Sequence, residues 1–256
     1  MKYRVQKVIG LVAAVTLFSS FLVAQAASAG RYDSAIQQQV VQKLAQKKEF
    51  QNVRASVEDG IVTLTGTVDV YQQKLDAAKR VRKAEHATGV RNLIEVAGEN
   101  VPDAQLQAKL AEKLWYDRIG YDNAFNHFAL GVKDGVVTVS GETLNDVGKD
   151  SALAIIQRMP GVKDVVDDIT VSPVSPFDDS LRLRAARVLY NDPVLSRYAM
   201  DPAAPIRIIV DRGKISLYGV VDSTMDKQIA GIRANQLFGA FSVENHLTVD
   251  KNEKIG

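Results

Sequence analysis

Residues 58–66 read EDGIVTLTG, residues 133–141 read KDGVVTVSG, and residues 211–219 read DRGKISLYG. Each stretch combines a tight-turn sequence, a run of β-type residues and a second glycine six positions after the first. Another strand-like run precedes each turn, at 53–57, 128–132 and 206–210. The pattern therefore predicts the same β-hairpin three times along the chain.

The glycines of these stretches are predicted to play two structural roles. The first glycine of each copy supplies the positive φ that a two-residue hairpin turn requires. The second glycine marks the far end of the second strand, and we predict that it lets the following helix begin close to the sheet. The turn glycines are Gly60, Gly135 and Gly213, and the inner glycines are Gly66, Gly141 and Gly219.

Helical patterns flank each hairpin. A first helix is predicted upstream, where apolar residues recur at i, i+4 and i+8 and form one stripe. These stripes are Ile36, Val40 and Leu44, then Leu106, Leu110 and Leu114, then Leu181, Ala185 and Leu189. The second helix, downstream, is expected to bury Leu75, Ala78 and Val81, then Ala152, Ile155, Ile156 and Met159, then Met225, Ile229 and Ile232.

A closing strand after the second helix completes the order αββαβ. This order predicts an α+β protein of three tandem modules, each a small mixed β-sheet with two helices packed on one face. Module 1 covers residues 31–98, module 2 covers 103–172 and module 3 covers 177–250. Short proline-containing linkers separate them, at 99–102 and 172–176, which predicts semi-rigid connections.

The thrice-repeated hairpin, the helix after it and the glycine-valine start of the closing strand resemble the BON (bacterial OsmY and nodulation) domain. The first copy departs from the pattern in the length of its closing segment. Val96 follows Gly89 by seven residues, whereas the distance is ten residues from Gly161 to Val171 and from Gly239 to Val249. The sequence therefore does not decide whether module 1 has the same closing strand. The resemblance implies a periplasmic or envelope-associated protein, linked to osmotic or envelope stress, that binds phospholipid or other envelope components and has no catalytic residues.

The N-terminus has the features of a secretory signal. Lys2, Arg4 and Lys7 precede an apolar run over 8–24, and Ala27-Ser28-Ala29 fits a signal peptidase site, so residues 1–29 are predicted to be removed. An uncleaved membrane anchor is the alternative. Cleavage would change the formal charge of +2 to −1, so the protein is not expected to bind nucleic acid. The sequence contains no cysteine, which excludes a lipoprotein anchor and disulfides.

Motifs for enzyme chemistry are missing from the sequence. The three histidines, His86, His127 and His246, lie at non-equivalent places (the end of a helix, a long loop and a closing strand) and form no ligand motif. The acidic run Asp164, Asp167 and Asp168 lacks the spacing of a calcium loop and is interpreted as the charged edge of a sheet. We therefore expect no enzyme activity, no metal, no cofactor and no small-molecule substrate.

Three features are candidates for binding. Lys79, Arg82, Lys83 and His86, with Arg80 beside them, are predicted to form a basic face on the second helix of module 1, suited to anionic headgroups unless it is only a solvated face. Trp115, with Tyr116 next to it, and Tyr190 share one repeat position and suit a lipid boundary, or else pack under a long loop. A second stripe of module 3, which includes Leu183, Arg187 and Tyr190, needs a partner of its own: a neighbouring module or subunit, a membrane or a polypeptide.

These features favour a non-enzymatic envelope protein of the periplasm. We expect it to associate with anionic phospholipid membrane surfaces or envelope proteins and to support osmotic stress tolerance. The alternative is a chaperone-like protein that holds unfolded polypeptides on exposed apolar grooves.

Overall fold

The computed structural model describes residues 30–117, 122–201, 203 and 205–250, so the predicted signal peptide at 1–29 lies outside the described residues. The described residues form two compact units, with the division between Glu99 and Asn100. None of the described helices is long and apolar enough to cross a bilayer.

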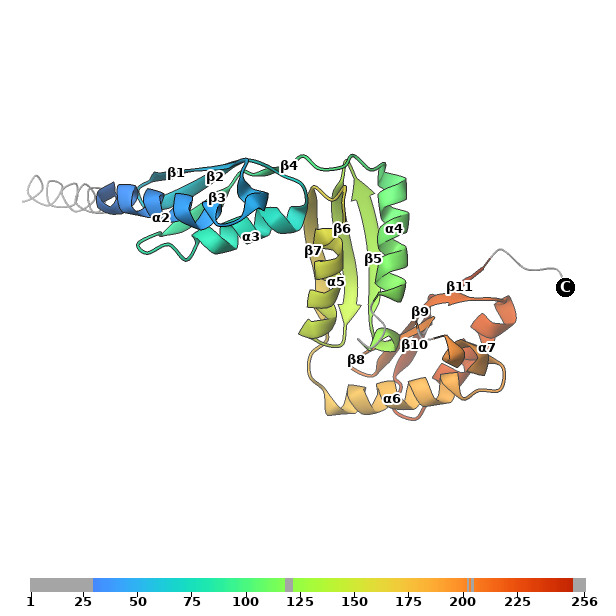
Figure 1. The fold of residues 1–256 in the computed structure, drawn as a ribbon. Coiled ribbons are helices and arrows are strands. Elements are labelled where there is room, and N and C mark those ends of the chain that lie inside the picture. The colour runs from blue at the N-terminus through green and yellow to red at the C-terminus, as the bar shows by residue number, and fades with distance from the viewer. Residues whose placement is uncertain (1–29, 118–121, 202, 204, 251–256) are drawn as a thin grey trace, which may run out of the picture. The chain divides into compact units, whose positions relative to one another are not determined.

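Unit 1 is built on one small mixed sheet (Figure 1). Strand β2 is central: β1 pairs with it antiparallel, while β3 and β4 pair with successive halves of it in parallel. The parallel pairing requires a crossover, which α3 provides. The elements are α2 (Asp33–Ala45), β1 (Val53–Glu58), β2 (Ile61–Val68), α3 (Tyr71–Val81), β3 (Gly89–Asn92) and β4 (Glu95–Val96), with short 3-10 turns at Gly30–Tyr32 and Lys48–Phe50.

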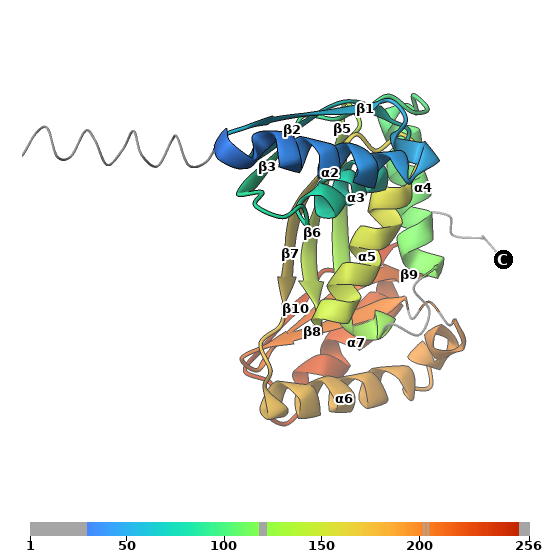
Figure 2. The same cartoon turned by 60° about the vertical axis from the view of Figure 1, so that its left-hand side comes forward.

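Unit 2 repeats this order twice (Figure 1, Figure 2). Its first sheet has the order β5-β6-β7, and in its second sheet β8, β10 and β11 all pair with β9. The first set comprises α4 (Asp103–Tyr116), η3 (Asn123–Phe125), β5 (His127–Lys133), β6 (Val136–Thr143), α5 (Asp146–Arg158) and β7 (Asp164–Val171). The second comprises α6 (Pro176–Tyr190), η4 (Leu195–Met200), β8 (Ile206–Asp211), β9 (Lys214–Val221), α7 (Thr224–Asn235), β10 (Ser242–Asn245) and β11 (Thr248–Val249). The predicted fold class, three tandem α+β modules with two helices on one face of each sheet, is confirmed.

The first helix of each module buries the stripe predicted for it. In module 1, for example, Ile36 and Val40 pack against Val62 and Leu64 of the central strand. All nine stripe residues of α2, α4 and α6 are buried. A single apolar stripe is therefore enough to hold each first helix on its sheet.

The second helix of module 3 turns a different face to the core from the one predicted. Met225 and Ile232 are exposed and Ile229 is partly buried against the core, while Ala230 and Ala234 are fully buried. Ser223 caps the helix by accepting a hydrogen bond from the Asp226 N–H, and this start directs the small residues toward the sheet. Alanine stands at the matching place in all three modules, as Ala77, Ala152 and Ala230, each fully buried. The prediction assumed that the largest apolar side chains face the core, but the helix packs so close to the sheet that small side chains are needed there.

The turn glycines have the predicted conformation. Gly60, Gly135 and Gly213 have φ of +77°, +79° and +77°, and the residue before each also has positive φ, as in a type I′ turn. An aspartate in the first turn of the first helix accepts hydrogen bonds from both turn amides. Asp178 thus binds the N–H groups of Arg212 and Gly213 at 3.0 and 2.8 Å. Asp33 and Asp103 do the same in modules 1 and 2.

The role predicted for the inner glycines is wrong. A Cβ on Gly66 would lie 2.0 Å from the Asn52 carbonyl oxygen, at the start of the neighbouring antiparallel strand, not against the second helix. Gly141 and Gly219 meet the carbonyls of His127 and Pro205 at 2.1 and 1.9 Å in the same way. The inner glycines therefore allow close approach within the hairpin, with φ between +106° and +129°.

The closing strand of module 1 is present and in the same register as the others. Val96, Val171 and Val249 pair with equivalent residues of the central strands. The residue that matches Gly161 and Gly239 is His86, which also has positive φ, at +67°. Each closing segment therefore spans ten residues from this position, and the apparent deletion came from taking Gly89 as the starting point. The equivalence was missed because glycine, not histidine, is expected at a position with positive φ.

Candidate functional site: a basic groove between the helices of module 1

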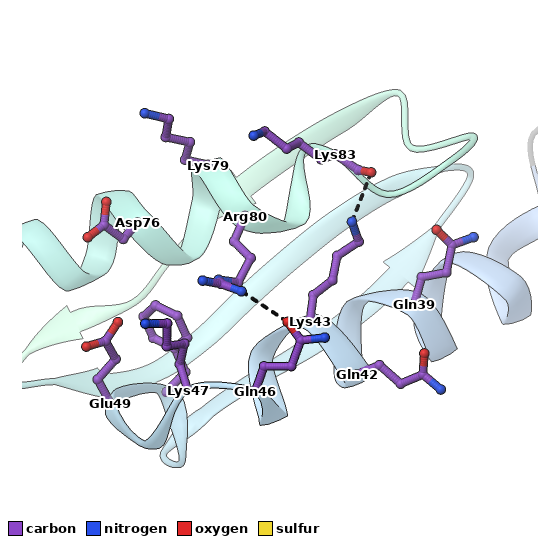
Figure 3. Close-up of a pocket in the computed structure, with 11 residues that line it drawn as sticks. Gln39, Gln42, Lys43, Gln46, Lys47, Glu49, Asp76, Lys79, Arg80 and Lys83 are labelled. Atoms are coloured by element: carbon purple, nitrogen blue, oxygen red, sulfur yellow. Dashed lines mark hydrogen bonds between the residues drawn. The ribbon is translucent and has the colours of Figure 1, made fainter.

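Helices α2 and α3 of module 1 enclose a groove of about 670 Å³. Side chains from both helices line it (Figure 3), and the buried Phe50 is the one apolar residue among the described residues that line it. We call this feature the module 1 groove. Its lining residues are Gln39, Gln42, Lys43, Gln46, Lys47, Glu49, Phe50, Asp76, Lys79, Arg80 and Lys83.

The module 1 groove is strongly basic. Five of its side chains are basic and two are acidic, which leaves a formal charge of +3. Within the described parts of the chain, none of the seven forms an ion pair. Their hydrogen bonds go elsewhere: Lys43 Nζ donates to the Lys83 carbonyl at 3.1 Å and Arg80 Nη1 to Gln46 Oε1 at 3.3 Å (Figure 3). The positive charge is thus open to an outside anion.

The predicted basic helix face has a different geometry in the structure. Helix α3 ends at Val81, so Arg82 is its C-cap and Lys83 and His86 lie in the turn beyond it. The turn forms because Ala84 is drawn into the core and its N–H bonds the Val81 carbonyl. Lys79, Arg80 and Lys83 line the groove, whereas Arg82 does not. Lys43 and Lys47 complete the site from α2, and they were missed because they lie about 35 residues away in the sequence.

The same interhelical position is hollow in the other two modules but has different chemistry. In module 2, Lys113 pairs with Asp117 at 2.8 Å, and in module 3, Arg233 pairs with the buried Asp192 at 2.7 Å. Burial acts to raise the pKa of Asp192, but hydrogen bonds from the Val194 amide and Arg233 outweigh it and lower that pKa. Asp117 and Asp192 occupy the repeat position that Lys47 occupies in module 1. One position thus holds an acid that pairs with one base of the hollow in two modules, and a base in the third.

The other residues predicted to bind lipid lie in unit 2. Trp115 is half-buried beneath the Arg207 guanidinium, 4.5 Å from the ring centroid, and the Tyr190 hydroxyl donates to the Ile206 carbonyl at 2.6 Å. Burial raises the pKa of Tyr190. Tyr116 is 54% exposed, and Arg187 lines the interhelical hollow of module 3. The structure therefore brings Trp115 and Tyr190 toward Arg207 and does not join them with Arg187 in one surface.

Two further placements concern the acids and histidines. Strand β7, which carries Asp164, Asp167 and Asp168, is an edge strand, and Asp167 pairs with Lys149 at 2.8 Å. His127 is the first residue of β5, not part of a long loop. Among the described residues, no three His, Asp or Glu side chains form a group that could hold a metal ion.

Two curated relatives each match about half of the chain. The osmotically-inducible protein Y of Escherichia coli (strain K12) is 28% identical over 151 residues, 54% of this chain and 71% of that protein. An uncharacterized protein of the gshII 5' region of Anaplasma centrale is 26% identical over 144 residues, 52% of this chain and 91% of that protein. A solved structure of CdsD, a structural protein of the type III secretion system of Chlamydia trachomatis, covers 83% of this chain and 90% of its own, with 11% identity and a TM-score of 0.25, too low to carry an argument.

The family match coincides with the three sheets. The BON domain matches residues 32–98, 102–173 and 192–251, and each match contains one hairpin, its crossover helix and its closing strand. The chain therefore belongs to the BON domain family and carries the domain three times.

Proposed function

We propose that this protein is a non-enzymatic binding protein of the bacterial periplasm that associates with anionic phospholipid surfaces through the module 1 groove. The observation that carries the proposal is the +3 charge of the groove, none of which is in an ion pair among the described residues. Each basic residue close to an anionic membrane contributes about 1 kcal/mol. Three unneutralised charges thus support weak, salt-sensitive docking.

The family membership and the osmotically inducible relative support a role in the envelope under osmotic stress. The predicted export signal, with cleavage after residue 29, is consistent with such a location. A surface that docks reversibly on phospholipid headgroups would act by holding the protein at the membrane, and it needs neither catalytic groups nor a cofactor.

Vesicle co-sedimentation tests the proposal. The protein is expected to bind vesicles that contain phosphatidylglycerol, to bind phosphatidylcholine vesicles poorly, and to lose binding at high salt. The triple variant Lys47→Gln, Lys79→Gln, Lys83→Gln should weaken binding at least about tenfold. A matched control, Lys109→Gln, Lys133→Gln, Lys163→Gln, removes the same charge from exposed positions outside the groove. An equal loss in both variants would show that only net charge matters and would refute a groove site.

A second candidate function is the holding of unfolded polypeptides. Module 3 favours it because Phe238, Phe241 and Met225 are 93%, 79% and 65% exposed. Exposed apolar side chains of this kind mark interaction surfaces. Suppression of client aggregation that is lost in Phe238→Ser with Phe241→Ser, together with vesicle binding that does not depend on lipid charge, would favour this function over the first.

A further inference from the structure

Arg207 is a buried cation on the face of the module 3 sheet that points away from that module's own core. Its strand neighbours Ile206 and Ile208 point into the core, so Arg207 points to the opposite face. In module 1 the same repeat position holds Arg54, which is exposed. Arg207 is only 6% exposed, because η3 lies against β8 and Trp115 lies under its guanidinium.

The burial leaves Arg207 without an acidic partner. Among the described residues, its Nη1 has no hydrogen-bond partner and no carboxylate forms an ion pair with it. Burial lowers the pKa of Arg207 to about 10, although Tyr190 and Asp201 act to raise it. The group is therefore still charged at neutral pH. A buried charge with an unmade hydrogen bond is unfavourable, which suggests that an acceptor from outside completes the site.

A pocket of about 270 Å³ adjoins this arginine within unit 2. Its walls are mainly apolar, and none of the described residues that line it is acidic. The Gln107 amide nitrogen is already used, since it donates to the Leu130 carbonyl at 3.0 Å. The lining residues are Gln107, Ala111, Leu114, Trp115, Asn126, His127, Phe128, Leu130, Arg207 and Gly219.

His127 does not add a second charge at neutral pH. Its ring stacks on Tyr218 at 3.9 Å between centroids, and Tyr218 also stacks on His246. Burial, and then the charges of Arg207 and His246, lower the pKa of His127. The pocket thus offers one permanent cation beside an apolar wall.

We propose that this pocket binds a monocarboxylate with an apolar body, of which a free medium-chain fatty acid is the simplest. Arg207 lines the pocket, and a carboxylate fits the planar fork of its guanidinium. The acyl chain would lie against Leu114, Phe128 and Leu130. A single cation balances one carboxylate, whereas a phosphate monoester would bring about two charges. This site lies in unit 2 and does not depend on the module 1 groove.

Trp115 is the only tryptophan of the chain and lines the pocket, so its fluorescence reports binding there. Laurate, added to the purified protein below its micellar concentration, should change this fluorescence in a saturable way. Dodecanol has the same chain without the charge, and its affinity should be lower by a factor of about ten or more. Equal binding of the two, or no saturable change with laurate, would overturn the proposal.

Two variants locate the charge that is responsible. Arg207→Gln should remove the preference for laurate over dodecanol, and circular dichroism checks that the variant is folded. Arg54→Gln is the matched control, because it removes an arginine from the same repeat position of module 1 and should leave laurate binding unchanged. If a folded Arg207→Gln protein bound laurate as tightly as the unmodified protein, the assignment to Arg207 would be wrong. If Arg207→Gln did not fold, the laurate and dodecanol comparison on the unmodified protein would still decide.

Discussion

The grooves between the two helices of module 1 and of module 3 have the same place in the fold, but one repeat position carries a base in module 1 and an acid in module 3. In module 3, Asp192 neutralises Arg233 and is itself buried, so the charge serves to hold α6 and α7 together. In module 1, Lys47 stands where Asp192 stands, and it forms no ion pair within the described part of the chain. One position can therefore be used for stability in one copy of a repeat and become available for binding in another.

The framework around these positions does not diverge in this way. The aspartate at the start of the first helix holds the hairpin turn in all three modules, and the inner glycine meets a backbone carbonyl in all three. Substitutions in the framework should therefore act on stability, and substitutions in the grooves should act on binding.

The largest effect is expected at an inner glycine. Gly141→Val would place a Cβ 2.1 Å from the His127 carbonyl at a φ of +129°, and it should destabilise module 2 by about 3 kcal/mol or more. Thermal and urea unfolding measure this loss. Gly131→Val is the control on the neighbouring strand, since nothing lies within 4 Å of a Cβ there. Equal unfolding midpoints for the two variants would contradict the role of the inner glycines.

The next largest loss of stability is expected when an aspartate that binds the hairpin turn is removed. Asp178→Ala leaves the buried Gly213 amide without an acceptor and should cost about 2 kcal/mol. Asp33→Ala removes the same contacts in module 1, but there the aspartate is only half-buried and water can replace it, so about 1 kcal/mol is expected. Hydrogen exchange of the amides at 60 and 213 reads the two turns separately. A larger acceleration of exchange at residue 60 in Asp33→Ala than at residue 213 in Asp178→Ala would reverse this ordering.

Exchanging charges between grooves tests the comparison directly. Asp117→Lys should give module 2 an unpaired basic groove and strengthen binding to phosphatidylglycerol vesicles by about 1–2 kcal/mol. Lys47→Asp should weaken binding by a similar amount. Asp117→Asn, which removes the acid without adding a base, should fall between the unmodified protein and Asp117→Lys. Unchanged vesicle binding in both exchange variants would show that the grooves do not take part in membrane binding.

The smallest effect concerns the position that differs between modules in the closing segment. His86 has a φ of +67° where modules 2 and 3 have glycine. Both His86→Gly and His86→Ala lose the stacking of the ring on Tyr32, but only glycine accepts this φ without strain. The glycine variant should be more stable than the alanine variant by about 1 kcal/mol in urea unfolding. An alanine variant that matched it would show that this backbone conformation carries no strain.

The local features of the fold were predictable from the sequence. A type I′ turn depends on two adjacent residues, so the glycines at 60, 135 and 213 were assigned correctly. The stripes of the first helices follow from helical periodicity, and the order αββαβ follows from the repeat. The phase of α7 was not predictable in this way, because alanines are its fully buried residues, while Met225 and Ile232 point to solvent and Ile229 is only partly buried against the core.

By itself, the sequence determined that the chain folds as a repeat of one hairpin-and-helix module, since turns and apolar periodicity are written in neighbouring residues. Only the tertiary structure decided which charges have partners. It placed Lys43 and Lys47 beside Lys79 and Arg80, and it buried Arg207 where its repeat equivalent Arg54 is exposed. The reason is that the strength of a charge depends on its distance from other charges and on its exposure to water, and both arise from contacts between residues far apart in the chain.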